Sequence, residues 1–327
     1  MSAVRKLAER HHLRWWEALP WIAGVAMFFA FPNYLAFGTQ LLITILFALS
    51  LDLVLGYAGI VTLGHAAFFG AGAYTVGILA QHAGWNEPLS GLVAAALVAG
   101  AIGLASGLVL LRTHGLTLLM VTLCTMTLLE QAANMGAAWT GGFDGMPGLS
   151  FKKILGLFAF DVLYFRTQYL YALALLFGCF LLVRMLVYSS FGQSLTGVRE
   201  NLLRMHAVGA PVRARLVLAY TASAALAGIA GGLFTQTTGY VNLAAFGLER
   251  AAGVLIVLIL GGYGRVYGAF VGAIAYLVLE HLLAKAYPTA WQLGIGITLM
   301  MVALYARNGI LGLGETLRRR MQRQGAP

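Results

Sequence analysis

Acidic side chains are scarce in this sequence, so the few that fall inside apolar stretches are the first candidates for chemistry. The chain of 327 residues contains 11 Asp and Glu, and four of them, Asp52, Glu130, Glu249 and Glu280, lie in apolar runs. Asp52, Glu249 and Glu280 fall near the ends of these runs, where contact with water or an arginine accounts for them. Glu130 lies deeper, and buried carboxylates at such positions are costly and often functional.

The stretch 122–134 around Glu130 is the most polar of the apolar runs. Four of its side chains could form a polar face on one helix: Thr122, Thr125, Glu130 and Asn134. Such a face could line a path for a solute across a membrane. Hydrogen bonds between neighbouring helices are the alternative explanation, and the pattern leaves both open.

The motifs that would make the chain an enzyme are absent from its sequence. The phosphate-binding pattern G-x-x-x-x-G-K-[ST] does not occur, because none of the four lysines follows a glycine. There is no H-E-x-x-H, no G-x-S-x-G, and no clustered Cys/His/Asp set with metal-ligand spacing. We therefore expect no catalytic residues, no metal site and no cofactor bound by this chain.

Composition places the chain in a membrane. It is 60% hydrophobic and 10% charged, with a mean hydropathy of +0.83, whereas soluble domains are about 25% charged. A soluble enzyme, a disordered chain and a small disulfide scaffold are thereby excluded. The net charge of +10 is explained by basic residues at the ends of membrane spans rather than by nucleic-acid binding.

The predicted fold is all-α and polytopic, with about 8–10 transmembrane helices. A spanning helix needs about 20 mostly apolar residues, and ten candidates meet this pattern: 19–37, 38–56, 61–81, 89–111, 115–136, 168–187, 214–235, 249–263, 266–284 and 290–306. The count is open because the glycine breaks at 57–64 and 261–268 could be re-entrant turns.

The basic residues give the orientation. With ten spans, 16 of the 21 Lys and Arg fall on the side that holds the termini and 5 on the other, which predicts that both termini are cytoplasmic. We divide the chain into a cytoplasmic N-terminal segment 1–18, a membrane domain 19–306 with a long cytoplasmic loop 188–213, and a basic cytoplasmic tail 307–327.

Two segments repeat each other weakly. Residues 64–74 and 266–276 share six identities in eleven positions, and each follows a break rich in glycine and tyrosine. Weak internal repeats are common in transporters, around a site bounded by broken helices. Ten spans make the two segments parallel, and an inverted repeat would require one break to be re-entrant.

The loop 188–213 contains a predicted amphipathic helix over 194–208. Its apolar face comprises Leu195, Val198, Leu202 and Met205, opposite three charged residues, Arg199, Glu200 and Arg204. Gly209 stands where this helix would end, shortly before Pro211. The helix could lie in the lipid headgroups or dock a cytoplasmic partner.

Four stretches in this order resemble the permease subunits of branched-chain amino acid ABC importers, of the LivM type. They are 56–74, which reads GYAGIVTLGHAAFFGAGAY, 112–123, the turn TGGFDG at 140–145, and the region from the 189–213 loop through GGYGRVYGAFVG at 261–272. One departure is Thr117-Leu118-Leu119, where the family has an aromatic pair.

The resemblance implies an assembly in the bacterial inner membrane. A second permease subunit of the LivH type, two cytoplasmic ATP-binding subunits and a periplasmic substrate-binding protein would be its partners, and ATP would be used by the partner subunits. The 194–208 helix would couple to the ATPase, with the residues Arg199, Glu200, Asn201, Arg204 and Gly209. The translocation path candidates are Gly64, His65, Phe68, Thr122, Thr125, Glu130 and Asn134.

The expected cargo is leucine, isoleucine or valine. Relatives that carry urea, short amides or aromatic acids keep these as alternatives within the same architecture. A secondary transporter or channel is the alternative from another class, and it would need no coupling helix.

Overall fold

Helices make up all the regular elements of the described part of the chain. The computed structural model describes residues 18–151, 165–288, 290–305, 309–310 and 312. In these residues the extended backbone forms a single isolated bridge, between Met146 and Val241. The predicted N-terminal segment 1–18 and tail 307–327 lie almost entirely outside the described residues.

Six helices in the described residues have a length of 18 residues or more. They are α3 (Leu35–Asp52), which continues into the π-helical turn η3 (Leu53–Tyr57), α5 (Pro88–Leu110), α6 (Leu116–Met135), α8 (Phe165–Tyr188), α11 (Val212–Thr238) and α13 (Gly268–Ala286). The shorter ones are α2 (Leu19–Ala30), α4 (Ala66–His82), α7 (Ala137–Thr140), α9 (Ser190–Glu200), α10 (Leu202–Ala207), α12 (Leu248–Gly261) and α14 (Trp291–Tyr305). Three turns of 3-10 helix complete the set: η2 (Pro32–Tyr34), η4 (Gly142–Asp144) and η5 (Leu243–Ala245).

The ten predicted spans coincide with ten of these helices. Seven helical stretches in the described residues are long and apolar enough to cross a membrane, and α2, α4 and α14 are shorter. This confirms an all-α, multi-pass membrane protein. Three predicted boundaries were wrong. The first span ends at Ala30, not 37, and the second begins at Leu35, not 38, because η2 forms at Pro32 between them. The third begins at Ala66, not 61, because residues 59–64 are not helical.

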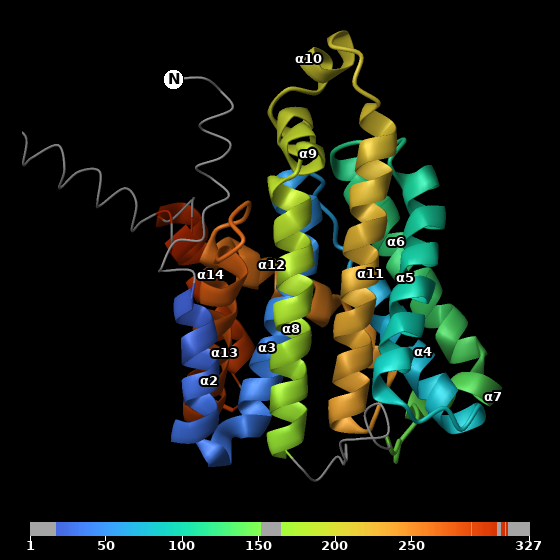
Figure 1. Ribbon diagram of the computed structural model, residues 1–327, viewed down its shortest axis with the longest axis vertical. Helices are drawn as coiled ribbons and strands as arrows, with labels where there is room; N and C mark the ends of the chain where they lie inside the picture. The colour runs from blue at the N-terminus through green and yellow to red at the C-terminus, as the bar shows by residue number, and fades with distance from the viewer. Residues whose placement is uncertain (1–17, 152–164, 289, 306–308, 311, 313–327) are drawn as a thin grey trace, which may run out of the picture.

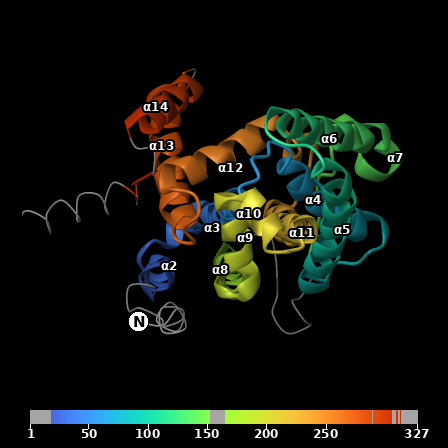
Figure 2. The ribbon, with the colours of Figure 1, turned by 90° about the horizontal axis from the view of Figure 1, so that it is seen from above.

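The long helices run side by side, with α9 and α10 at one end and α7 at the other (Figure 1). We call these ends the α9 end and the α7 end. Helix α11 packs against α3, α4 and α5, and α12, α13 and α14 lie to one side of this group (Figure 2).

Small residues allow the helices of this group to approach closely. A β carbon at Gly228 would meet Ala95 and Ala99 of α5, and one at Gly72 would meet the Gly228 carbonyl. Close backbone contact of this kind is the usual basis of helix association in lipid. Gly72 and Gly228 are therefore packing sites.

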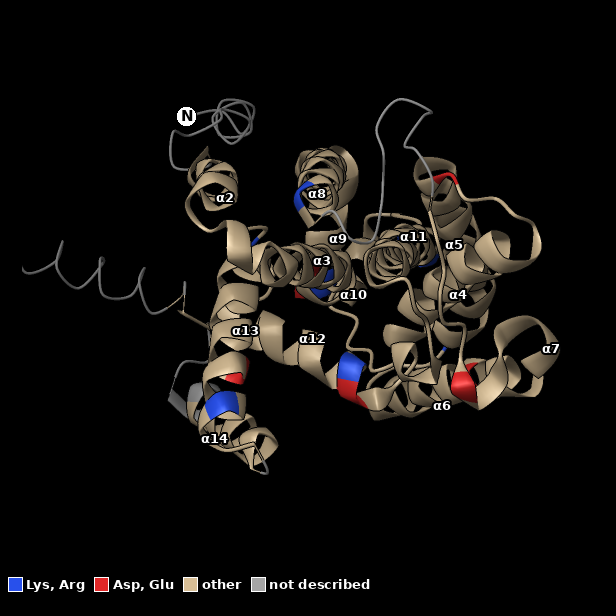
Figure 3. Ribbon diagram, turned by 90° about the horizontal axis from the view of Figure 1, so that it is seen from below, with Lys and Arg blue, Asp and Glu red and all other residues tan. Residues whose placement is uncertain are grey.

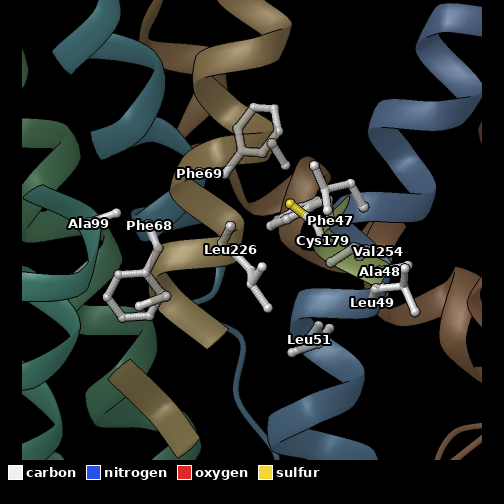
Figure 4. Close-up of a cluster of buried hydrophobic side chains, with 14 of the residues drawn as sticks. Phe47, Ala48, Leu49, Leu51, Phe68, Phe69, Ala99, Cys179, Leu226 and Val254 are labelled. Atoms are coloured by element: carbon white, nitrogen blue, oxygen red, sulfur yellow. The ribbon is translucent and has the colours of Figure 1, made fainter. Parts of the chain in front are cut away.

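The core lies where α3, α4, α8, α11 and α12 meet (Figure 4). Phe47 of α3 is 4.8 Å from Phe69 of α4 between ring centroids. Cys179 is buried in this core, as expected for a small apolar side chain, whereas Cys124 is exposed on α6.

Candidate functional site

The predicted coupling helix is two helices rather than one. Helix α9 ends at Glu200, and α10 begins at Leu202. Asn201 between them has an extended backbone (φ −156°, ψ 98°), and its side-chain oxygen accepts a hydrogen bond of 2.9 Å from the Arg204 N–H. The prediction of a single helix over 194–208 was therefore wrong. The spacing of apolar residues continues through Asn201, but asparagine is a strong helix N-cap, and a new helix starts after it.

Helix α9 packs on the bundle, and α10 projects from it (Figure 1). Leu195 and Val198 of α9 are buried, as the amphipathic pattern predicts. On α10 and just after it, Leu203 is 80% and Val208 is 77% exposed. Gly209 ends this segment with φ 79°, at the predicted position. The exposed side chains of Leu203 and Val208 thus form an apolar tip beyond α9, the helix that packs on the bundle.

The first glycine break leads back into the bundle. After η3 the chain is not helical until Ala66. His65 lies beside Ser50 of α3, because the Ser50 hydroxyl is 2.9 Å from His65 Nε2. Ser50 is seven residues before Tyr57, so the chain has moved about 10 Å along the helix axis. Non-helical backbone at this depth is tolerated where it is buried in protein or lines a water-filled cavity. Here Gly64 packs against Thr122 of α6, and the side chains of Thr62 and His65 are buried.

The two glycine breaks meet beneath α9. The Gly264 N–H of the second break donates a 2.7 Å hydrogen bond to Asp52 Oδ1, at the end of α3. Asp52 is 1% exposed, and its other carboxylate oxygen has no partner among the described residues. A carboxylate that accepts a backbone N–H forms one of the stronger hydrogen bonds available in a protein. The two breaks are thereby tied to each other.

Arg199 of α9 contacts both breaks. Its guanidinium donates to the Gly56 carbonyl, one residue before the first break, and its side chain lies against Gly59 within that break. The guanidinium also stacks over the Tyr263 ring of the second break, with Cζ 5.4 Å from the ring centroid. It also interacts electrostatically with Asp52. We call Asp52, Gly56, Arg199, Tyr263 and Gly264 the break junction.

The break junction also settles how the two repeated segments run. Helices α3 and α12 both end there, and α4 and α13 both lead away from it. The repeat is therefore parallel, as the ten-span reading predicts. Sequence reasoning placed Arg199 on an exposed face with Glu200 and Arg204. All three are exposed, and the Arg199 guanidinium in addition bonds to the Gly56 carbonyl.

The path candidates do not form one surface. Gly64 packs against the Thr122 carbonyl of α6, which brings these two together. His65 and Phe68 are buried: the His65 ring stacks on Phe47, and Phe68 lies edge-on to Tyr220.

The other path candidates on α6 are partly accessible. The Thr125 hydroxyl bonds to the carbonyl of Val121 in its own helix, and Glu130 and Asn134 are both half-buried. Their roles stay predictions.

The family model for "Branched-chain amino acid transport system / permease component" matches residues 33–304, which include both breaks and the α9–α10 segment. The chain belongs to this family. Its description names a permease component of a transport system. Among the described residues, no three His, Cys, Asp or Glu side chains are grouped so that they could hold a metal ion.

The names of proteins similar to this chain state different cargo. The high-affinity branched-chain amino acid transport system permease proteins LivM of Salmonella typhimurium strain LT2 and Escherichia coli strain K12 are each 29% identical, over 84% of this chain and 68% of their own length. The autoinducer 2 import system permease protein LsrC of Enterobacter sp. strain 638 is 31% identical, over 80% of this chain and 76% of its own. No solved structure matches the chain.

The permease sequence alone did not single out the break junction. Asp52 was noted only as a carboxylate near the end of a span, and Tyr263 and Gly264 only as part of a break. The available signal was the matching composition of the two breaks, which did not indicate that they touch.

Proposed function

We propose that this chain is the inner-membrane permease subunit of an ATP-driven importer for branched-chain amino acids. Membership of the permease family and the two LivM relatives support this cargo. The α9 end would face the cytoplasm with both termini, as the distribution of basic residues predicts. The assembly would contain a LivH-type permease, two ATP-binding subunits and a periplasmic substrate-binding protein.

The observation that carries this proposal is the contact of α9 with both glycine breaks. A partner that moves α9 acts directly on Gly56 through the Arg199 guanidinium and on the second break through Tyr263. The exposed tip at Leu203 and Val208 offers apolar surface to such a partner.

Coupling in this scheme is a shift between two packings of one membrane domain. The ATP-binding subunits and the loaded binding protein each favour one packing, and each therefore changes the affinity of the chain for the other. In the packing described here the breaks are held together by Asp52 and Gly264. In the other packing this hydrogen bond would open. Residues 188–213 transmit the change, and this chain itself binds no nucleotide.

Leucine uptake into proteoliposomes tests the proposal. The chain is reconstituted with its partner permease, with and without the ATP-binding subunits, and uptake of radioactive leucine is measured with binding protein outside and ATP inside. The proposal predicts uptake only when ATP, the ATP-binding subunits and the binding protein are all present. Leucine flux through the permeases without ATP would overturn it and favour a secondary carrier.

A second cargo class is favoured by the LsrC relative, whose name states autoinducer 2 import. In that case the same proteoliposomes would show ATP hydrolysis stimulated by the binding protein without leucine uptake. Urea, short amides and aromatic acids would then be tried as cargo in the same assay.

A further inference from the structure

Arg250 carries a positive charge inside the membrane domain, and the proposed coupling assigns it no role. It lies in the first turn of α12, which spans Leu248–Gly261. Figure 3 shows the charged start of this helix near α6, where the two neighbouring charges are Glu249 and Arg250. Charged side chains within a membrane are costly and usually serve a function.

Two aromatic rings hold the Arg250 guanidinium. Its Cζ lies 4.7 Å from the ring centroid of Phe69 on α4 and 4.6 Å from that of Phe234 on α11. Both distances are within the range of a favourable cation–π contact. The two ring centroids are themselves 5.7 Å apart, so the rings lie beside each other on one side of the guanidinium and do not enclose it.

Within the described residues, the guanidinium N–H groups lack the acceptor that a buried arginine normally has. The Arg250 Nε is buried without a hydrogen-bond partner there, and the residue forms no ion pair in the described part of the chain. Its neighbour Glu249 accepts a hydrogen bond of 3.1 Å from the Gln292 amide and acts on Arg250 only electrostatically. An arginine that rests against two rings without an ion pair there is suited to a planar anion, because a guanidinium pairs with a carboxylate through two parallel hydrogen bonds.

The backbone around Arg250 adds to the positive field. Helix α12 begins after Gly247, and its first intrahelical bonds are donated by the N–H groups of Arg250 and Ala251 to the Gly247 carbonyl. The preceding N–H groups, of Leu248 and Glu249, have no acceptor within the helix. A helix N-terminus carries a partial positive charge that favours anions.

The depth of Arg250 suits cargo arriving from outside. Phe234 is four residues before the end of α11 at Thr238 and Phe69 is thirteen residues before the end of α4 at His82, so the guanidinium lies roughly 6–20 Å inside the α7 end. Under the proposed function, on which this inference rests, the α7 end faces the binding protein.

We propose that Arg250 binds the carboxylate of the transported amino acid in the half of the membrane domain nearest the α7 end. Phe69 and Phe234 hold the guanidinium in place. A cargo with a carboxylate pairs with the charge as it enters, whereas a neutral cargo of the same shape leaves it unpaired. The site thus selects amino acids over uncharged solutes within the permease itself.

Four variants of the complete reconstituted importer test this proposal. Arg250→Gln removes the charge, Arg250→Lys keeps it, and Arg250→Met keeps an apolar side chain against the two rings. Arg166→Gln is the matched control, because Arg166 is an exposed arginine near the start of α8 at the same end. Leucine uptake and ATP hydrolysis are measured in the same proteoliposomes.

We expect Arg250→Gln and Arg250→Met to lower leucine uptake at least tenfold, while ATP hydrolysis stays within twofold of the wild type. Arg250→Lys should retain more uptake than either, and Arg166→Gln should behave as the wild type. A merely structural arginine predicts that Arg250→Met keeps uptake, since methionine still packs against both rings. Wild-type uptake in Arg250→Met or Arg250→Gln would overturn the proposal.

A separate measurement distinguishes failure of this proposal from failure of the proposed cargo. The purified permease pair is heated with isovalerate or with its neutral analogue isovaleramide. The site predicts a higher Tm with isovalerate than with isovaleramide in the wild type and equal Tm values in Arg250→Gln. Equal Tm values in the wild type would overturn it even if leucine is transported. If leucine is not transported but isovalerate stabilises, the carboxylate site stands and only the cargo is revised.

Discussion

Replacing Gly56 by alanine tests the break junction without any assumption about transport. An added β carbon at Gly56 would overlap Asp52 Oδ1 and the Gly264 nitrogen, and would lie 2.8 Å from Asp52 Cγ. These are the atoms that join the two breaks, so the substitution must push the breaks apart. The chain gains a methyl group where there is no room for one.

The size of the effect follows from two contributions. Overpacking a filled site costs about 1–3 kcal/mol. Losing a hydrogen bond to a charged group costs about 1.5–3 kcal/mol more, and relaxation of the surroundings reduces the sum. We expect a loss of about 2–5 kcal/mol in the free energy of unfolding. At about 2 °C per kcal/mol for a large chain, the Tm should fall by roughly 4–10 °C.

Thermal unfolding of the purified chain in detergent measures this effect, with Gly178→Ala as the matched control. Gly178 lies within α8, and an added β carbon there would meet no atom within 4 Å. Alanine is favoured over glycine inside a helix by about 0.5–1 kcal/mol, so this control should be as stable as the wild type or more so. Equal Tm values for Gly56→Ala and Gly178→Ala would refute the close contact of the two breaks.

Two further predictions concern the groups around α9. Asp52→Ala should lower the free energy of unfolding by about 1.5–3 kcal/mol, because the Gly264 N–H loses its acceptor. Asp52→Asn should lower it less, because the amide oxygen still accepts this hydrogen bond. Equal losses for the two variants in thermal unfolding would contradict this. Leu203→Ser combined with Val208→Ser should leave the Tm almost unchanged, because both side chains are exposed. The same double variant should weaken co-purification with the ATP-binding subunits at least tenfold, and undiminished co-purification would show that the tip is not their docking surface.

Most of the fold could be predicted from the sequence, because membrane spans depend on local composition. Ten apolar runs gave ten helices, since about 20 apolar residues have few alternatives to a helix in lipid. The boundary errors came from the backbone rather than from hydropathy. Residues 59–64 are apolar enough to belong to a span, but Gly59 has φ 73° and the chain there is not helical.

The candidate site was harder to predict because its contacts join distant parts of the chain. The Asp52–Gly264 hydrogen bond spans 212 residues, and the Arg199–Gly56 contact spans 143. Sequence periodicity placed Arg199 on the outer face of a helix, where its long side chain still reaches inward. Arg250 was missed altogether, since Phe69 and Phe234 come from two other helices and leave no pattern near it.

The ratio of leucine imported to ATP hydrolysed tests the central claim most directly: α9 acts on both breaks through Arg199. The complete importer is reconstituted with wild-type chain or with Arg199→Met, and both rates are measured in the same proteoliposomes. The account predicts that the variant hydrolyses ATP within twofold of the wild-type rate but imports at least tenfold less leucine. An unchanged ratio would contradict it, because coupling would then not pass through the contacts of Arg199 with Gly56 and Tyr263.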